Sequence, residues 1–178
     1  PCQAMADLQT ISEKMDPRQA ELAYVGDGNN MAHSLALLAG VLGLKLRIGT
    51  PDSHRPEAGV MARVEAASAT SGASVTWTED PAAAIAGADF VYTDTWTSMG
   101  QEAEAQERRK IFEAYQVNEA LLEGAPNAYV MHCLPAHRGE EITDAVLDGD
   151  RSLVYEQAEN RLHSQKAILE RTMLAPRP

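Results

Sequence analysis

The fold is decided by residues 22–42, which read LAYVGDGNNMAHSLALLAGVL. The apolar run at 22–25 predicts a buried strand, and the Gly-Asp-Gly at 26–28 predicts a tight turn directly after it. Two asparagines, which are good helix-capping residues, lead into an Ala- and Leu-rich segment over 31–42 that stops before Gly43. The stretch therefore predicts a strand, a loop and a helix in succession.

The same unit recurs along the chain. Short β-prone runs alternate with helical patterns, which favours a parallel sheet covered by helices on both faces. We therefore expect an α/β protein with a three-layer α/β/α, Rossmann-like domain and a parallel sheet of about five strands. The further strands are expected at 45–48, 74–77, 89–92 and 128–131, and the further helices at 3–15, 57–69, after Pro81, 104–114, 118–122 and 156–173.

Length and composition fit one globular domain. The 178 residues are 44% hydrophobic and 23% charged, which is enough for a sizeable core. A formal net charge of −11 opposes a nucleic-acid partner, and no apolar run approaches the roughly 20 residues that cross a bilayer. Cys2 and Cys133 without a secretory signal favour a reduced, cytoplasmic setting. Because the chain starts at Pro1 rather than Met, we expect it to be part of a longer protein.

Parallel sheets bind ligands at the carboxyl ends of their strands. The first loop of interest, at 26–31, half resembles a dinucleotide fingerprint, with Asp52 roughly where an acid could bind a ribose. Met31 stands where the third glycine should be, which argues against that interpretation. Two alternatives stay open, namely a plain turn with a helix cap, and a loop that presents asparagines and a helix N-terminus to a small anion.

The second loop, 94–102, places an acid at a strand end before a flexible Ser-Met-Gly turn. Such a loop could hold an ammonium group and close over a ligand. The alternative is a surface loop in which Asp94 caps the next element.

The third loop, 132–139, is the richest in reactive side chains. His132 and Cys133 could be a nucleophile with its base, but adjacent residues on a strand point to opposite faces. Two His and one Cys fall short of a closed metal site, so we expect no metal. By geometry alone, Cys133 serves as a polar contact as readily as a nucleophile.

Arg161 lies near the start of the last expected helix. An Arg there is a capable binder of phosphate or carboxylate. The alternative is a surface ion pair with Glu156 or Glu159.

Five stretches in this order resemble the ornithine carbamoyltransferase family. The similarity runs from residue 1 to about residue 170, and the Ser-Met-Gly at 98–100 is its most telling part because it marks an ornithine-closing loop. The five stretches are Pro-Cys-Gln at 1–3, Gly-Asp-Gly-Asn-Asn-Met at 26–31, Asp-Thr-Trp-Thr-Ser-Met-Gly-Gln-Glu at 94–102, His-Cys-Leu-Pro-Ala-His-Arg-Gly at 132–139 and Gln-Ala-Glu-Asn-Arg at 157–161.

The resemblance implies an enzyme without a cofactor that transfers the carbamoyl group of carbamoyl phosphate to the δ-amine of L-ornithine, giving L-citrulline and phosphate. The family joins a carbamoyl phosphate domain to an ornithine domain and assembles as a homotrimer or a multiple of trimers. Residues 1–178 would be the ornithine-binding domain, with the interdomain helix at about 1–16 and the carbamoyl phosphate domain absent. We therefore expect neither a nucleic acid nor a membrane as a partner.

The resemblance also assigns the ornithine contacts. Asn30 and the backbone N–H of Met99 would hold the ornithine carboxylate, while Asp94 and Ser98 would hold its α-ammonium. Cys133 would lie beside the reacting δ-amine as the catalytic side chain, acting either as a proton acceptor or only as a contact.

Carbamoyl phosphate contacts follow in the same way. The main chain of Cys133 and Leu134 would receive the carbamoyl NH₂, Arg161 would reach the phosphate end, and Gln3 would touch the amide. The family's Ser-Thr-Arg-Thr-Arg phosphate loop and the His before Pro1 are absent, so we expect the isolated chain to be inactive. Gln157 stands where an acid is common, a change we expect to be tolerated. The alternatives are a dinucleotide-binding module and a catalytically inactive ornithine-binding relative.

Overall fold

The computed structural model describes residues 2–97 and 105–174. Its centre is a parallel sheet of five strands in the order β3-β2-β1-β4-β5. The predicted α/β class and all five predicted strands are confirmed. The strands are β1 Glu21–Val25, β2 Lys45–Gly49, β3 Ser74–Thr78, β4 Phe90–Thr93 and β5 Tyr129–His132.

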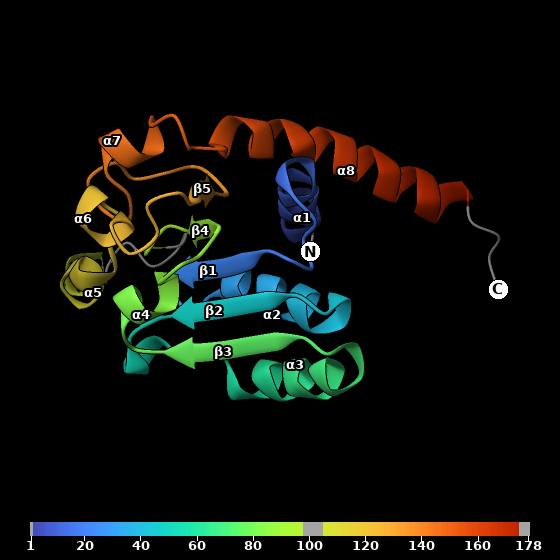
Figure 1. Cartoon of the computed structure of the whole chain (residues 1–178), viewed down its shortest axis with the longest axis horizontal. Coiled ribbons are helices and arrows are strands. Elements are labelled where there is room, and N and C mark those ends of the chain that lie inside the picture. Colours follow the sequence, from blue (N-terminus) through green and yellow to red (C-terminus); the bar gives the residue numbers. More distant parts are fainter. Residues whose placement is uncertain (1, 98–104, 175–178) are drawn as a thin grey trace.

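Helices cover both faces of this sheet, and α8 extends past the rest of the domain beyond its contact with α1 (Figure 1). One short helix, α7, was not predicted, because a single turn carries too little periodicity to be recognised. Within the two described ranges, no helix combines the length and apolar composition needed to cross a bilayer. The helices are α1 Cys2–Lys14, α2 Asn30–Leu42, α3 Ala58–Ser71, α4 Pro81–Ile85, α5 Ala105–Phe112, α6 Glu119–Leu122, α7 Asp144–Leu147 and α8 Val154–Leu174.

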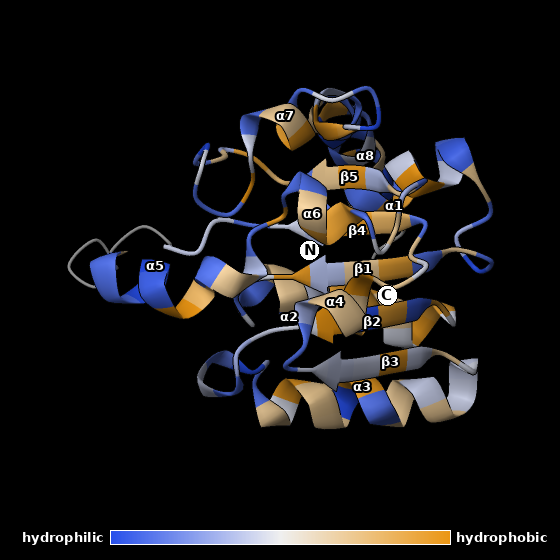
Figure 2. Ribbon diagram, turned by 60° about the vertical axis from the view of Figure 1, so that its left-hand side comes forward, coloured by the Kyte–Doolittle hydropathy of each residue, from blue (hydrophilic) through white to orange (hydrophobic). Residues whose placement is uncertain are grey.

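The sheet separates two apolar cores, as expected for strands whose successive side chains face opposite sides. On β1, Tyr24 packs into the core shared with α1, α2 and α3, whereas Ala23 and Val25 pack into the core shared with α4 to α7. Apolar residues accordingly line the interior on both faces of the sheet (Figure 2). Burial on both faces explains why β1, β4 and β5 read as apolar runs. The edge strand β3 and its neighbour β2 alternate polar and apolar residues instead.

The turn after β1 shows why the sequence forms a helix there. The side chain of Asn29 accepts hydrogen bonds from the backbone N–H groups of Met31 and Ala32, which satisfies two of the free donors at the start of α2. Helix α2 ends at Gly43, whose φ of +74° suits glycine because it has no Cβ. Both ends of the predicted helix are therefore set by local residues.

A buried polar network joins α1 to α8 and to the sheet. The Asp7 carboxylate, fully buried, accepts from the Gln3 amide at 2.8 Å and from the Gln157 amide at 2.7 Å. The Gln157 amide also donates to the Tyr92 hydroxyl at 3.2 Å. Burial raises the pKa of Asp7 from its ordinary 3.8 to about 6, although these hydrogen bonds act in the opposite direction.

Asp7→Asn is therefore expected to stabilise the fold most at neutral pH. Because the pKa of Asp7 is raised in the folded state, Asp7 stabilises the fold only while its carboxyl group is protonated. This contribution to the free energy of unfolding is lost as the pH rises from about 4 through 6. The difference between 3.8 and about 6 corresponds to roughly 3 kcal/mol. Urea unfolding at pH 4.5 and 7.5 should show the variant's advantage growing with pH.

The exposed Glu170→Gln is the control and should shift stability by less than about 0.5 kcal/mol at either pH. An Asp7→Asn variant that is equally destabilised at both pH values would show that the network requires the carboxylate.

Candidate functional site

The candidate site lies where the order of the strands reverses. The chain passes from β1 to β2 on one side and later returns to place β4 on the other side of β1, so the loops after β1 and β4 diverge. Such switch points are where parallel sheets form ligand crevices. The loops after β1, β4 and β5 leave the same edge of the sheet (Figure 1).

Asp94, directly after β4, joins these three loops. Its carboxylate accepts from the Asn29 amide at 2.9 Å on one side and from the Cys133 thiol at 2.9 Å on the other. It also accepts from the backbone N–H of Thr95 at 2.8 Å. Asp94 is only 8% exposed, so a carboxylate is presented from a largely dry environment. Residues far apart in the sequence thus meet on one negatively charged group.

The Cys133 thiol is held in its neutral form. Burial raises the pKa of Cys133 far above its ordinary range, and the neighbouring Asp94 carboxylate raises it further. The thiolate is the nucleophilic form of cysteine, so this environment disfavours attack by sulfur. The arrangement suits a thiol that donates a hydrogen bond to Asp94.

His132 is not the base for Cys133 in this structure. One ring nitrogen, Nδ1, accepts from the backbone N–H of Leu134 at 2.8 Å, and the other, Nε2, lies 3.1 Å from Oε1 of Glu141. The side chains of His132 and Glu141 are both completely buried. Both ring nitrogens are therefore occupied by groups other than the thiol.

A buried ion pair holds the loops after β1 and β4 together from behind. The Arg108 guanidinium, on α5, binds the Asp27 carboxylate and donates from Nε to the Trp96 carbonyl at 2.5 Å. Burial raises the pKa of Asp27 above its ordinary value, with Arg108 acting in the opposite direction. Arg108 thus fixes both Trp96 and the turn after β1.

The dinucleotide alternative does not fit this geometry. A Cβ built on Gly28 would lie 2.4 Å from the His54 carbonyl oxygen and 2.5 Å from the backbone of Arg55 and Pro56. In a dinucleotide site, this glycine lets the pyrophosphate approach the backbone closely. Here the protein's own backbone takes that position beside Gly28. Asp52, the suggested ribose acid, instead forms an ion pair with Arg55 at 2.5 Å.

Of the other predicted ornithine contacts, Asn30 is exposed at the first position of α2, and Ser98 and Met99 lie outside the described residues. The neighbouring Asn29, which the sequence indicated as a helix-capping residue, is the asparagine that binds Asp94. Its amide group carries both functions, because the oxygen caps α2 and the nitrogen binds Asp94.

The predicted carbamoyl phosphate contacts gather around the buried network. Arg161 donates to the Gln3 side chain at 2.6 Å, and among the described residues it forms no ion pair with Glu156 or Glu159. The Gln157 oxygen accepts from the backbone N–H of His132 at 3.0 Å, which links this network to the end of β5. Gln157 therefore uses its amide nitrogen to bind Asp7 and its amide oxygen to hold the end of β5.

Asp94, His132 and Cys133 offer three ligand atoms within 4.8 Å of one another, as do His137, Glu140 and Glu141. The sequence-based prediction of no metal considered only the possible ligands within 132–139. It did not include Asp94, which follows a different strand. The atoms of the first group are already engaged in the hydrogen bonds described above.

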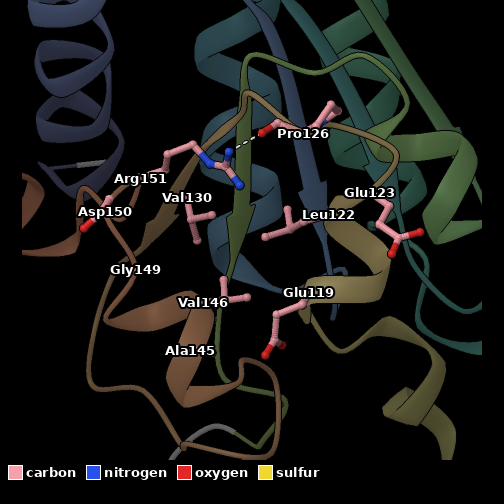
Figure 3. A pocket seen from close by; sticks show the side chains of 10 residues that line it. All are labelled: Glu119, Leu122, Glu123, Pro126, Val130, Ala145, Val146, Gly149, Asp150 and Arg151. Carbon is pink, nitrogen blue, oxygen red and sulfur yellow. Dashed lines mark hydrogen bonds between the residues drawn. The ribbon is translucent and has the colours of Figure 1, made fainter.

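A pocket of about 510 Å³ lies away from these residues, between α6, α7 and β5. Its side chains, drawn in Figure 3, combine an apolar floor of Leu122, Val130 and Val146 with carboxylates of Glu119 and Glu123. None of the site residues above lines it.

The comparisons with known proteins identify the family of the chain. A family described as "Aspartate/ornithine carbamoyltransferase, Asp/Orn binding domain" matches residues 18–172. An ornithine carbamoyltransferase of Thermococcus kodakarensis is 52% identical over 97% of the chain and 56% of its own length. An anabolic ornithine carbamoyltransferase of Pyrococcus furiosus is 51% identical over 97% of the chain and 56% of its own length. The chain thus spans about half the length of the curated relatives that it matches.

Solved structures give the same result for the fold. The ornithine carbamoyltransferase of Pyrococcus furiosus superposes with a TM-score of 0.90 at 50% identity, over 96% of this chain and 55% of that one. The ornithine transcarbamoylase of Giardia lamblia reaches 0.91 at 31% identity, over 99% and 60% of the two chains.

Alkylation should report the state of Cys133. In a Cys2→Ser background, we expect iodoacetamide to modify Cys133 far more slowly at pH 8 than it modifies a free exposed thiol, because the raised pKa suppresses the thiolate. Asp94→Asn removes the adjacent negative charge and should raise the rate about 10-fold or more. Mass spectrometry of timed samples measures both rates.

Asp150→Asn, which changes an exposed carboxylate, should leave the rate as it was. A wild-type rate equal to that of an exposed thiol would contradict the neutral, shielded thiol.

Loss of Arg108 should destabilise the fold strongly. Arg108→Met leaves Asp27 buried without its cation, for which we expect a loss of about 3–5 kcal/mol in the free energy of unfolding. Adding Asp27→Asn should recover a large part of that loss, because the unpaired charge is removed. Arg109→Met, on the exposed side of the same helix, should cost less than about 1 kcal/mol. Chemical denaturation of the wild-type protein and the three variants gives the comparison. Equal losses for Arg108→Met and Arg109→Met would contradict a stabilising role for the buried pair of Arg108 and Asp27.

Proposed function

Because the chain belongs to the aspartate/ornithine carbamoyltransferase family, through its Asp/Orn binding domain, we propose that it is the ornithine-binding half of an ornithine carbamoyltransferase. The reaction transfers the carbamoyl group of carbamoyl phosphate to the δ-amine of L-ornithine and releases phosphate. The observation that carries this proposal is the Asp94 carboxylate at the switch point, shared by the loops after β1, β4 and β5. A carboxylate that is largely removed from water suits a substrate bearing ammonium groups.

The ornithine end of the site is proposed as follows. Asp94 binds the α-ammonium together with Ser98, and Asn30 with the backbone N–H of Met99 binds the carboxylate. The exposed position of Asn30 at the start of α2 supports this role, because the helix N-terminus adds partial positive charge.

The chemistry requires a neutral amine. An alkyl ammonium resembles lysine, with a pKa near ~10.4, so only about one molecule in 10³ to 10⁴ is neutral at pH 7. Forming the nucleophile thus costs about 4–5 kcal/mol unless the site lowers that pKa. Exclusion of water from the site lowers it, after which the amine nitrogen attacks the carbamoyl carbon. The C–O bond to phosphate then breaks, and the proton that the attacking nitrogen loses leaves with the phosphate.

Cys133 contributes as a contact in this scheme. Its thiol is neutral, so it orients the amine through hydrogen bonds and does not accept the first proton. The sulfur forms no covalent bond, and the excess proton of the ammonium passes to solvent.

The carbamoyl phosphate end is proposed to use the main chain of Cys133 and Leu134, with Gln3 and Arg161. The Arg161–Gln3 hydrogen bond and the link from Gln157 to His132 support a shared role for these residues. Most contacts to the phosphate would come from a Ser-Thr-Arg-Thr-Arg loop that these 178 residues do not contain. We further propose the family's cytoplasmic setting, its role in arginine biosynthesis, its assembly as homotrimers, and a linking function for the helix at about 1–16.

Citrulline formation tests the proposal. The chain should be compared with a chimera in which the part of the Pyrococcus furiosus relative that it does not cover precedes residue 1. We expect the chimera to form citrulline and the chain alone to form none, because the phosphate charge lacks its partners. In the chimera, Asp94→Asn should raise KM for ornithine about 10²-fold, since an ammonium loses its ionic partner.

The Pyrococcus enzyme is the positive control, and calorimetric titration with ornithine shows whether an inactive protein still binds it. A folded chimera that binds ornithine with carbamoyl phosphate present, yet forms no citrulline, would assign the chain to a non-catalytic ornithine-binding relative.

A further inference from the structure

The hydrogen bonds of His132 define its tautomer. A backbone N–H can only donate, so the 2.8 Å contact from Leu134 requires an unprotonated Nδ1. A neutral imidazole then carries its proton on Nε2, which donates to Glu141 at 3.1 Å. The same Glu141 oxygen accepts from the backbone N–H of His137 at 2.5 Å. The imidazole ring is thereby fixed at both nitrogens.

The residue that His132 holds has an unusual backbone. Leu134 has a φ of +53°, and among the described residues it is the one non-glycine residue with a positive φ. This left-handed region is sterically unfavourable for a branched side chain, so surrounding interactions have to impose it. The Leu134 N–H bond to His132 is such an interaction, made directly on the residue concerned.

The position of this strained residue links it to the site. Cys133, immediately before it, binds Asp94 through its thiol, and the main chain of Cys133 and Leu134 is proposed to receive the carbamoyl NH₂. A change of φ at Leu134 would redirect the peptide groups on either side. The backbone of His132 is itself fixed by Gln157 at 3.0 Å, so the imidazole works from a rigid base.

We propose that His132 is a positioning residue for carbamoyl transfer. In its Nε2–H tautomer, which Glu141 selects, it holds Leu134 in the left-handed conformation that aims the 133–134 main chain at the carbamoyl group. The imidazole touches neither substrate and moves no proton in the reaction. The effect on carbamoyl transfer rests on the proposed function, whereas the tautomer of His132 and the left-handed backbone of Leu134 do not depend on it.

The tautomer can be measured without any activity. In the 178-residue chain labelled with ¹⁵N-histidine, His132 should show an Nδ1 resonance of the unprotonated type and an Nε2 resonance of the protonated type. His132→Asn identifies the signals. A protonated Nδ1 at neutral pH would overturn the inference, whether or not the protein proves to be a carbamoyltransferase.

Two substitutions of His132 test the roles of its two ring nitrogens separately. In the citrulline-forming chimera, His132→Asn keeps an acceptor near the Nδ1 position, whereas His132→Gln places its polar group near Nε2 and leaves the Leu134 N–H without a partner. We expect His132→Gln to lower kcat about 10²-fold with little change in KM for ornithine, as for a misplacement of about 1 Å. In His132→Asn, kcat should fall about 10-fold or less. This variant also carries Glu141→Gln, because the Glu141 carboxylate would otherwise be buried without its imidazole partner.

Rescue distinguishes positioning from general support of the fold. Glycine adopts positive φ without steric cost, so Leu134→Gly in the His132→Gln background should recover part of the lost kcat. A purely structural role predicts further loss instead, because a leucine side chain is removed. His163→Gln, on the exposed face of α8, is the matched control and should leave kcat unchanged.

Thermal unfolding of each variant completes the test. Equal loss of kcat in His132→Asn and His132→Gln, without rescue by Leu134→Gly, would overturn the positioning role. If the wild-type chimera forms no citrulline, the proposed function fails, and the tautomer measurement alone then decides whether His132 fixes Leu134.

Discussion

The site depends on one carboxylate placed where three loops converge. Asp94 is bound by Asn29 from the loop after β1 and by Cys133 from the loop after β5. This contact exists because β4 lies between β1 and β5 and all three strands point the same way. Each strand end supplies one polar group within reach of the others, and the order of the strands reverses between β1 and β4.

The residues behind the site are more polar than a core requires. Asp7, Gln157, His132 and Glu141 are almost completely buried, and each forms hydrogen bonds that join α1, α8 or the 133–141 segment to the sheet. Buried polar groups stabilise a fold only when their partners are in place, so such a network admits few alternative arrangements. It therefore defines the position of the β5 loop more sharply than apolar packing would.

The fold could be predicted from the sequence because β1, β4 and β5, which are buried on both faces, appear as short apolar runs between turns. The strands β2 and β3 alternate polar and apolar residues, which is also typical of a strand. The single turn of α7 could not, since four residues carry no period. For the site, the rule for parallel sheets brought Asp94 and Cys133 to one edge correctly. It did not predict the contact between Asn29 and Asp94, because the direction of the Asn29 amide depends on the cap geometry of α2.

Arg108 and Glu141 were missed for a related reason. Arg108 looks like any charge on an exposed helix, and only the burial of its partner Asp27 reveals its role. Glu141 follows another glutamate and looks like a surface charge in the sequence, yet its side chain is completely buried beside His132. Supporting residues of this kind are defined by three-dimensional contacts that no local spacing encodes.

The donors that Asp94 holds explain how its carboxylate is tolerated at a buried position. A neutral amide and a neutral thiol satisfy its oxygens, so the carboxylate is not left unpaired in a largely dry environment. A cationic donor makes a charge-assisted hydrogen bond that is roughly twice as strong as a neutral one. In the proposed function, a substrate ammonium would replace one of these neutral donors, and the displaced amide or thiol could then contact the rest of the substrate.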